Sequence, residues 1–246
     1  MVVTNEKTVS EAIKFRRSVR VFKKESIDDE KVRECIQLAT LAATSSNMQL
    51  WEFYHIVSPE ILKQLTVASF DQGAAKTAQQ MMVVVARKDL WKKRKQSNIA
   101  FLKSQYGDRP ASEYSKREKF ALNYYQKIIP SIYADFLGIF GMIKFFAFKI
   151  IGLFRPIYRE ARQSDMRIVA HKSAGLAAQN FMISMAAINY DTCPMEGFDR
   201  TQYDEILGLT DTTSVVVCAL GYRDETDEYQ NYKKVRKSQD DLFVNI

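Results

Sequence analysis

Three arginines and a serine lie within five residues near the N-terminus, in the segment Arg16-Arg17-Ser18-Val19-Arg20. Guanidinium groups stay charged at physiological pH and can bond two phosphate oxygens at once. Basic residues that follow a helix can also simply balance the helix dipole. The segment therefore indicates either a phosphate site or an ordinary helix end, and both interpretations stay open.

A polar loop, Thr44–Trp51, follows the second expected helix and reads TSSNMQLW. Its hydroxyl and amide side chains could donate hydrogen bonds to a polar heterocycle. The alternative is an ordinary helix end and turn, in which Asn47 takes a left-handed conformation. Both interpretations place the loop between a helix and a strand.

Two later segments could add contacts to a ligand. In Cys193–Asp199, a proline and a glycine bracket a short extended loop, where backbone groups can approach a ligand closely. In Lys233–Lys237, the sequence KKVRK supplies more cations for a phosphate, although a solvated charge run is the commoner explanation.

Several other chemistries are disfavoured by what the sequence lacks. It contains no G-x-S-x-G elbow and no glycine-rich loop of the G-x-G-x-x-G or Walker type. With two histidines and three widely spaced cysteines, we expect no metal site. The first residues hold no apolar stretch like that of a signal peptide, so we expect a cytoplasmic protein with buried, reduced thiols. The cysteines are Cys35, Cys193 and Cys218.

The composition is that of an ordinary globular chain of 246 residues, long enough for one large domain or two small ones. The net charge of +7 favours anionic partners such as nucleic acid, anionic lipid or phosphorylated small molecules, or it serves solubility alone. No zinc-finger, helix-turn-helix or RNA-binding signature accompanies the charge, so we expect no nucleic-acid partner.

Hydrophobic periodicity predicts a sheet covered by helices. A first helix is expected from Thr8, which forms a capping-box pattern with Glu11, and a second over 28–41, capped by Ser26. A long helix is expected to be buried along its apolar middle, 174–187. Strands separated by long helices favour an α+β or α/β class. The strands are expected at 53–57, 81–86 and 214–220, and the long helix at 164–189.

The region 88–163 differs from the rest, because it passes from charged sequence to the stretch 136–154, which is apolar apart from Lys144 and Lys149. A membrane-spanning helix needs about 20 apolar residues, and two central lysines would cost about 2.5–3.5 kcal/mol each. Three interpretations stay open: a buried lid or dimer-packing helix, a helix lying on a membrane surface, and a membrane span.

In this order, the polar segments resemble motifs of the FMN-dependent nitroreductase family. Arg16–Phe22 matches the family element R-x-S-x-[RK]-x-F, and Ala43–Trp51 matches P-S-S-x-N-x-Q-P-W with both prolines replaced. The resemblance covers about residues 8–86 and 164–242 and leaves 88–163 without a counterpart. Further matches are Gln72 before a buried strand, Gly175–Asn180 with Ser173 where the acid usually stands, Pro194–Phe198, and Lys234–Arg236.

The resemblance implies an α+β class with a three-layer α-β-α arrangement, in a single domain over 1–246 that contains a helical lid within 88–163. It also implies a homodimer whose FMN sites lie at the subunit interface. The FMN phosphate would be held by Arg16, Ser18, Lys234 and Arg236. Arg20 would lie near the pyrimidine edge of the flavin, where a fixed cation stabilises the negative charge of the reduced ring.

The remaining implied contacts surround the flavin ring. Polar residues of the loop after the second helix would reach the flavin of the partner subunit, and these are Thr44, Ser45 and Asn47. The residues expected beside the ring in their own subunit are Gln72, Pro194, Met195, Glu196 and Gly197.

The implied activity is the reduction of a small acceptor, such as a nitroaromatic compound or a quinone, by NADH or NADPH in a ping-pong scheme at FMN. No side chain is expected to act as a catalytic acid or base. A reductive dehalogenase or flavin reductase of the same superfamily is the first alternative. A membrane-surface binding protein built around 136–154 is the second.

Overall fold

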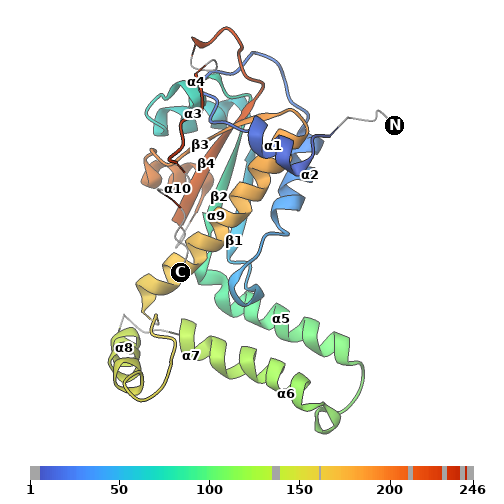
Figure 1. Cartoon of the computed structure of the whole chain (residues 1–246), viewed down its shortest axis with the longest axis vertical. Coiled ribbons are helices and arrows are strands. Elements are labelled where there is room, and N and C mark those ends of the chain that lie inside the picture. The colour runs from blue at the N-terminus through green and yellow to red at the C-terminus, as the bar shows by residue number, and fades with distance from the viewer. Residues whose placement is uncertain are drawn as a thin grey trace.

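The computed structural model describes residues 6–134, 139–160, 162–209, 213–228, 232–238 and 242, and its centre is an antiparallel four-stranded sheet (Figure 1). The strand order is β1-β2-β4-β3, and every residue of β2 is buried. A strand covered on both faces needs an unbroken apolar run, which the sequence QMMVVVA nearly supplies. The strands are β1 (Trp51–Ile56), β2 (Gln80–Ala86), β3 (Asp191–Met195) and β4 (Thr213–Gly221).

Helices cover both faces of this sheet, which gives three layers (Figure 1). Met82 and Val84 of β2 pack toward α2 (Asp29–Ala39) and α9 (Gln163–Ala187), and α1 (Val9–Phe15) packs on α9. The alternate residues of β2 face the other layer, because successive side chains of a strand point to opposite sides. That layer consists of α3 (Pro59–Ala68), α4 (Gly73–Thr77) and α10 (Arg200–Leu207). The predicted three-layer α+β class is confirmed.

The predicted helical region between β2 and α9 is present and extends away from the sheet (Figure 1). A π-helical turn, Tyr124–Ile128, joins the helix 116–123 to the short helix 129–133. Within the described ranges, no helix combines the length and apolar character needed to cross a bilayer. The helices are α5 (Trp91–Tyr106), α6 (Lys116–Asn123), α7 (Ile129–Tyr133) and α8 (Ile139–Ile151).

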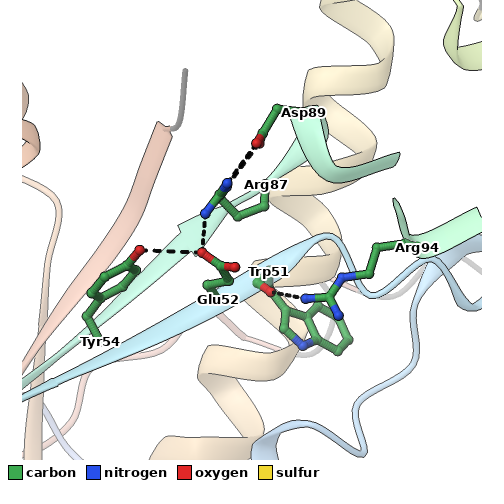
Figure 2. Close-up of polar contacts among 6 residues, drawn as sticks. All are labelled: Trp51, Glu52, Tyr54, Arg87, Asp89 and Arg94. Atoms are coloured by element: carbon green, nitrogen blue, oxygen red, sulfur yellow. Dashed lines mark hydrogen bonds and ion pairs between the residues drawn. The ribbon is translucent and has the colours of Figure 1, made fainter. Parts of the chain in front are cut away.

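Arg87 fixes the beginning of this region to the sheet. It follows β2 directly, and its guanidinium lies between the carboxylates of Glu52 on β1 and Asp89 (Figure 2). Its Nη2 donates to Oδ2 of Asp89 at 2.8 Å, and this bonding raises the pKa of Arg87 despite partial burial. Seven residues later, Arg94 donates to the backbone carbonyl of Trp51. The helical region therefore begins in a defined position relative to β1.

Two sequence-based expectations about helix ends and burial need correction. The predicted cap Ser26 is wrong, because Asp28 directly precedes α2 and its Oδ1 accepts the N–H of Glu30 at 2.9 Å. The capping box at Thr8 is confirmed. The middle of α9 is buried on one face only, since Leu176 on the opposite face is 53% exposed.

The strand β3 was expected to be part of an extended loop and is instead an edge of the sheet. It pairs with β4 from Asp191 to Met195, so Pro194 lies opposite Cys218. Proline has no backbone N–H to donate to a neighbouring strand, so it is tolerated in an edge strand, where one side of the backbone lacks a partner strand. The sequence-based assignment failed here because a five-residue strand with an internal proline carries almost no period-two signal.

A buried ion pair fastens the first residue of β3. Asp191, whose side chain is 3% exposed, accepts hydrogen bonds from Nε, Nη2 and the backbone N–H of Arg223 at 2.5–3.1 Å. The same guanidinium lies 4.1 Å from the ring centroid of Phe15 at the end of α1. This one contact therefore joins α1, β3 and the chain after β4.

Replacing Asp191 by alanine is expected to lower the free energy of unfolding by about 3–5 kcal/mol, because it leaves a largely buried cation unpaired. Glu225→Ala removes the exposed pair with Lys23 and is expected to cost about 0–1 kcal/mol. Urea denaturation of both variants measures the difference. Equal losses in the two variants would contradict this role for Asp191.

Candidate functional site

The arginine segment after α1 lies along the outer edge of β3. Ser18 forms a parallel bridge with Thr192, and the N–H of Val19 donates to the Thr192 carbonyl at 3.2 Å. Val19 is fully buried, so the alternation of an extended chain leaves Ser18 partly and Arg20 largely exposed. The hydroxyl of Thr192 is buried without a hydrogen-bond partner among the described residues. Because Val19 points into the core, Ser18 and Arg20 on either side of it point toward solvent.

The C-terminal cations reach the same place. The ammonium of Lys234 donates to the backbone carbonyls of Lys14 and Arg16, the latter at 2.7 Å. Partial desolvation lowers the pKa of Lys234, and the charges of Arg16, Arg17 and Arg236 lower it further. A lysine whose pKa is lowered by other cations marks a region of positive potential that an anion would stabilise.

In the described part of the chain, neither Arg16, Arg20, Lys234 nor Arg236 forms an ion pair with a carboxylate. Arg17 has a different role, since its Nη2 donates to the carbonyl of Tyr232 at 3.1 Å and so holds the C-terminal segment. The arrangement fits a phosphate group, whose oxygens accept hydrogen bonds from guanidinium and ammonium groups.

Gln72 connects this cluster to the loop after β3. Its Nε2 donates to the carbonyl oxygens of Ser69 at 3.0 Å and Gly197 at 2.5 Å. A Cβ on the next residue, Gly73, would lie 3.2 Å from the carbonyl oxygen of Arg20, which places that turn against the arginine segment. Both amide hydrogens of Gln72 are used within the protein, so a ligand could bond only to the amide oxygen.

The other residues expected beside a flavin ring lie at the end of β3 and just beyond it. Met195 is 3% exposed and packs in the core, so its side chain is turned away from any ligand in this position. Pro194 is half-buried, whereas Glu196 and Gly197 are exposed. Backbone groups of the exposed pair are therefore the ones that can reach a ligand near Arg20.

The three cysteines are free and buried, as expected from their apolar sequence contexts. Burial raises the pKa of the Cys193 thiol, although Arg20 and Arg16 partly oppose the shift. Burial also raises the pKa of Cys35 and of Cys218 to about 12. Protonated, buried thiols are poor nucleophiles, so none of them is suited to covalent catalysis.

The polar loop before β1 has a strained conformation held by the helical region. Ser46 and Asn47 both take positive φ angles, of 53° and 48°. The Ser46 hydroxyl lies 2.6 Å from the Tyr124 hydroxyl, Tyr125 donates to the Ser46 carbonyl, and Asn98 donates to the Asn47 carbonyl. These bonds leave Thr44 half-buried and the Ser45 and Asn47 side chains exposed. Residues held in rare conformations by surrounding bonds are frequent at functional sites.

A cavity of about 300 Å³ opens beside this loop. Its wall is mostly apolar, with three tyrosines that add aromatic surface. Burial raises the pKa of Tyr133 to about 12 and also raises that of Tyr158, so both remain neutral phenols at physiological pH. The lining residues are Ser45, Ser46, Tyr124, Ile128, Ile129, Ile132, Tyr133, Tyr158, Met166 and Val169.

The predicted site residues therefore form two groups in one subunit. The first gathers around β3 and includes Arg16, Ser18, Arg20, Gln72 and the two C-terminal cations. The second is the loop with Thr44, Ser45 and Asn47, which lies beside α5, toward the end of the sheet away from α1 (Figure 1). Among the described residues, no hydrogen bond joins the two groups.

The sequence profile described as "Nitroreductase family" matches residues 13–222. The chain belongs to the nitroreductase family. The prediction of a nitroreductase-type oxidoreductase is confirmed at this level.

Named relatives of this nitroreductase agree with the assignment. It is 27% identical over 236 residues to YdgI of Bacillus subtilis, described as a candidate NAD(P)H nitroreductase, with 95% of both chains covered. It is 26% identical over 217 residues to protein DrgA of Synechocystis sp., and the aligned region covers 87% of this chain and 84% of DrgA.

Solved structures agree as well. A candidate nitroreductase from Exiguobacterium sibiricum in complex with FMN superimposes with a TM-score of 0.65, at 22% identity and 98% coverage of both chains. The candidate nitroreductase ydfN of B. subtilis gives a TM-score of 0.70, at 21% identity and with 96% of this chain and 98% of that one covered.

Three residues of the nitroreductase site region were missed by sequence reasoning. Tyr124, Tyr125 and Asn98 hold the polar loop, although they follow it by 50 residues or more in the chain. The high aromatic content of 88–163 was the only available signal. The π-helical turn that contains both tyrosines has no sequence signature, although such turns occur frequently at functional sites.

Proposed function

We propose that this nitroreductase binds FMN and uses NADH or NADPH to reduce small acceptors such as nitroaromatic compounds and quinones. The observation that carries the proposal is the cluster of cations at the edge of β3, Arg16, Lys234 and Arg236, which pair with no carboxylate in the described part of the chain. It is supported by the relatives described as NAD(P)H nitroreductases and by the FMN in one structural neighbour. Bound FMN would supply the electron transfer, in a ping-pong scheme that no residue need assist as acid or base.

The chain's own residues would position the phosphate end of this cofactor. Lys234 has three N–H donors and uses two on backbone carbonyls, which leaves one for a phosphate oxygen. Arg16 and Arg236 add guanidinium donors, and Ser18 adds a hydroxyl beside them. Among the described residues no carboxylate pairs with these groups, so their charge is available to an incoming dianion.

The ring end would lie toward Arg20 and the loop after β3. Arg20 is exposed and unpaired among the described residues, so its fixed charge can stabilise negative charge on a bound ring without reorganisation. The bond from Gln72 to Gly197 holds that loop in place. The backbone of Glu196 and Gly197 would then meet the ring edge.

A homodimer would complete the site. Within one subunit, the loop with Ser45 and Asn47 is separate from the cation cluster, so we propose that it contacts the FMN of the partner subunit. A second copy would also cover apolar side chains that are more than half exposed, namely Val9 and Ile13 of α1 and Leu176 of α9.

The cavity beside this loop would receive the electron acceptor. Its aromatic and aliphatic lining suits a flat apolar ring, and its neutral tyrosines can donate hydrogen bonds to nitro or carbonyl oxygens. Because Tyr124, Tyr133 and Tyr158 all belong to the helical region, that region would act as the lid that sets acceptor preference.

The purified protein is expected to be yellow, with flavin absorbance at about 450 nm, and to oxidise NADH or NADPH once an acceptor is added. Mass spectrometry of the cofactor released by acid identifies it. A colourless protein that neither takes up added FMN nor oxidises either nucleotide would contradict the proposed function.

Arg16→Ala is expected to weaken FMN binding by about 1.5–3 kcal/mol, roughly 10- to 100-fold in Kd, because a charge-assisted phosphate contact is lost. Lys14→Ala is the matched control, since it removes an exposed positive charge two residues away and keeps the carbonyl that Lys234 bonds. Fluorescence titration of apoprotein with FMN measures both. Equal affinity in the two variants would show that Arg16 does not hold the phosphate.

Val169→Trp is expected to fill the cavity and to lower kcat/KM for a two-ring quinone about tenfold more than for benzoquinone. The adjacent Ile168→Trp introduces the same bulk at a side chain that is 48% exposed. It should leave the ratio of the two kcat/KM values unchanged. Steady-state kinetics with both acceptors decide the matter. A ratio unchanged in the first variant means that acceptors bind elsewhere.

A further inference from the structure

Helix α8 turns its apolar side chains toward solvent. Met142, Ile143, Phe146 and Ile150 recur at i, i+1, i+4 and i+8 and so share one face of the helix. Leu153 and Phe154 continue the exposed apolar surface in the turn that follows. All six side chains are between 59% and 84% exposed. A patch of this kind on a soluble protein marks a surface that something else covers.

One polar side chain of α8, that of Lys144, faces the protein, whereas Lys149 is exposed. The ammonium of Lys144 donates to the backbone carbonyls of Ile132, at 3.3 Å, and Ala134, next to the end of α7. On the same side, the guanidinium of Arg162 lies 3.5 Å from the ring centroid of Phe145. A helix on the surface of a soluble protein normally buries its apolar face and exposes its lysines. In α8 the bonds of Lys144 hold a lysine against the protein, and an apolar face is left exposed.

The apolar face is bordered by positive charge. Between residues 141 and 162 the chain contains five basic residues and one acidic residue, Glu160. Across the residues that the structure describes, Lys149, Arg155, Arg159 and Arg162 form no ion pair with a carboxylate. The basic residues are Lys144, Lys149, Arg155, Arg159 and Arg162.

Charge decides which partner fits this surface. A second copy docked through α8 about a two-fold axis would bring like charges together, since Lys149 and Arg155 border the contact on both sides. An anionic lipid surface offers what both features need, acyl chains for the apolar face and phosphates for the cations. The 13 residues of α8 rise only about 20 Å, which suits a helix lying in the plane of the interface.

We infer that α8 and the turn after it, residues 142–155, dock this protein on the surface of anionic membranes. Phe146, Ile150 and Phe154 enter the boundary between headgroups and acyl chains, while Lys149 and Arg155 contact lipid phosphates. The contact is peripheral and reversible. It does not depend on the proposed flavin activity, because none of these residues belongs to the cation cluster or to the acceptor cavity.

Flotation of the full-length protein with lipid vesicles tests the inference. Binding is expected to vesicles with about one third phosphatidylglycerol and to be much weaker with phosphatidylcholine alone. Phe146→Ser with Ile150→Ser should reduce binding at least about tenfold, because two apolar side chains no longer enter the lipid. The matched control is Leu41→Ser with Phe120→Ser, which removes two even more exposed apolar side chains elsewhere and should bind as wild type.

A charge-reversal pair provides a second, independent arm that leaves the apolar face intact. Lys149→Glu with Arg155→Glu should reduce binding at least about tenfold, whereas Lys24→Glu with Lys63→Glu makes the same change in net charge and should have little effect. Raising the salt from about 0.1 M to 1 M shortens the Debye length from about 10 Å to 3 Å and should release the wild type.

Three outcomes would overturn the inference. The first is wild-type protein that does not float with anionic vesicles. The second is equal binding by the α8 variants and their controls, which would mean that general positive charge is responsible. The third is a drop in oligomeric size, measured by light scattering, in the Phe146→Ser, Ile150→Ser protein together with unchanged flotation, which would show that a second copy covers α8.

Discussion

The burial of β2 on both faces is the constraint on which this structure depends. Because every residue of the strand is enclosed, helices must cover the sheet twice, and no polar ligand can approach its centre. Polar chemistry is therefore confined to the edges and ends of the sheet. The arginine segment lies at the β3 edge, the Ser45–Asn47 loop precedes β1, and Arg87 begins the helical region where β2 ends.

Basic side chains in this protein have different roles according to whether a neighbouring carboxylate neutralises their charge. Arg223 and Arg87 pair with carboxylates and stabilise the fold, one at the start of β3 and the other at the root of the helical region. Within the described ranges Arg16 and Lys234 form no ion pair, and Lys234 donates to neutral carbonyl oxygens. Carbonyls position a cation without cancelling its charge, so the cluster keeps an attraction for an anion that a salt bridge would remove.

The helical region between β2 and α9 serves the molecule in two ways. Near the sheet, Asn98 and the tyrosines of the π-helical turn hold the polar loop in a left-handed conformation, and Tyr124 also lines the cavity beside it. At its far end, α8 carries its apolar side outward. The same segment would thus shape the approach of an acceptor and place the protein at a lipid surface, where apolar acceptors concentrate.

The sequence by itself determined the three-layer class, three of the four described strands, the helices α1, α2 and α9, and the candidate site residues. The continuous apolar run of β2 and the capping box at Thr8 are local signals, and local signals survive without tertiary information. Tertiary structure alone decided that Pro194 lies in an edge strand, that Met195 is buried, and that Tyr124 supports Ser46 from 78 residues away. It also decided which face of α8 meets solvent. The physical reason is that pairing, burial and neutralisation depend on residues distant in the chain, whereas periodicity and residue type do not.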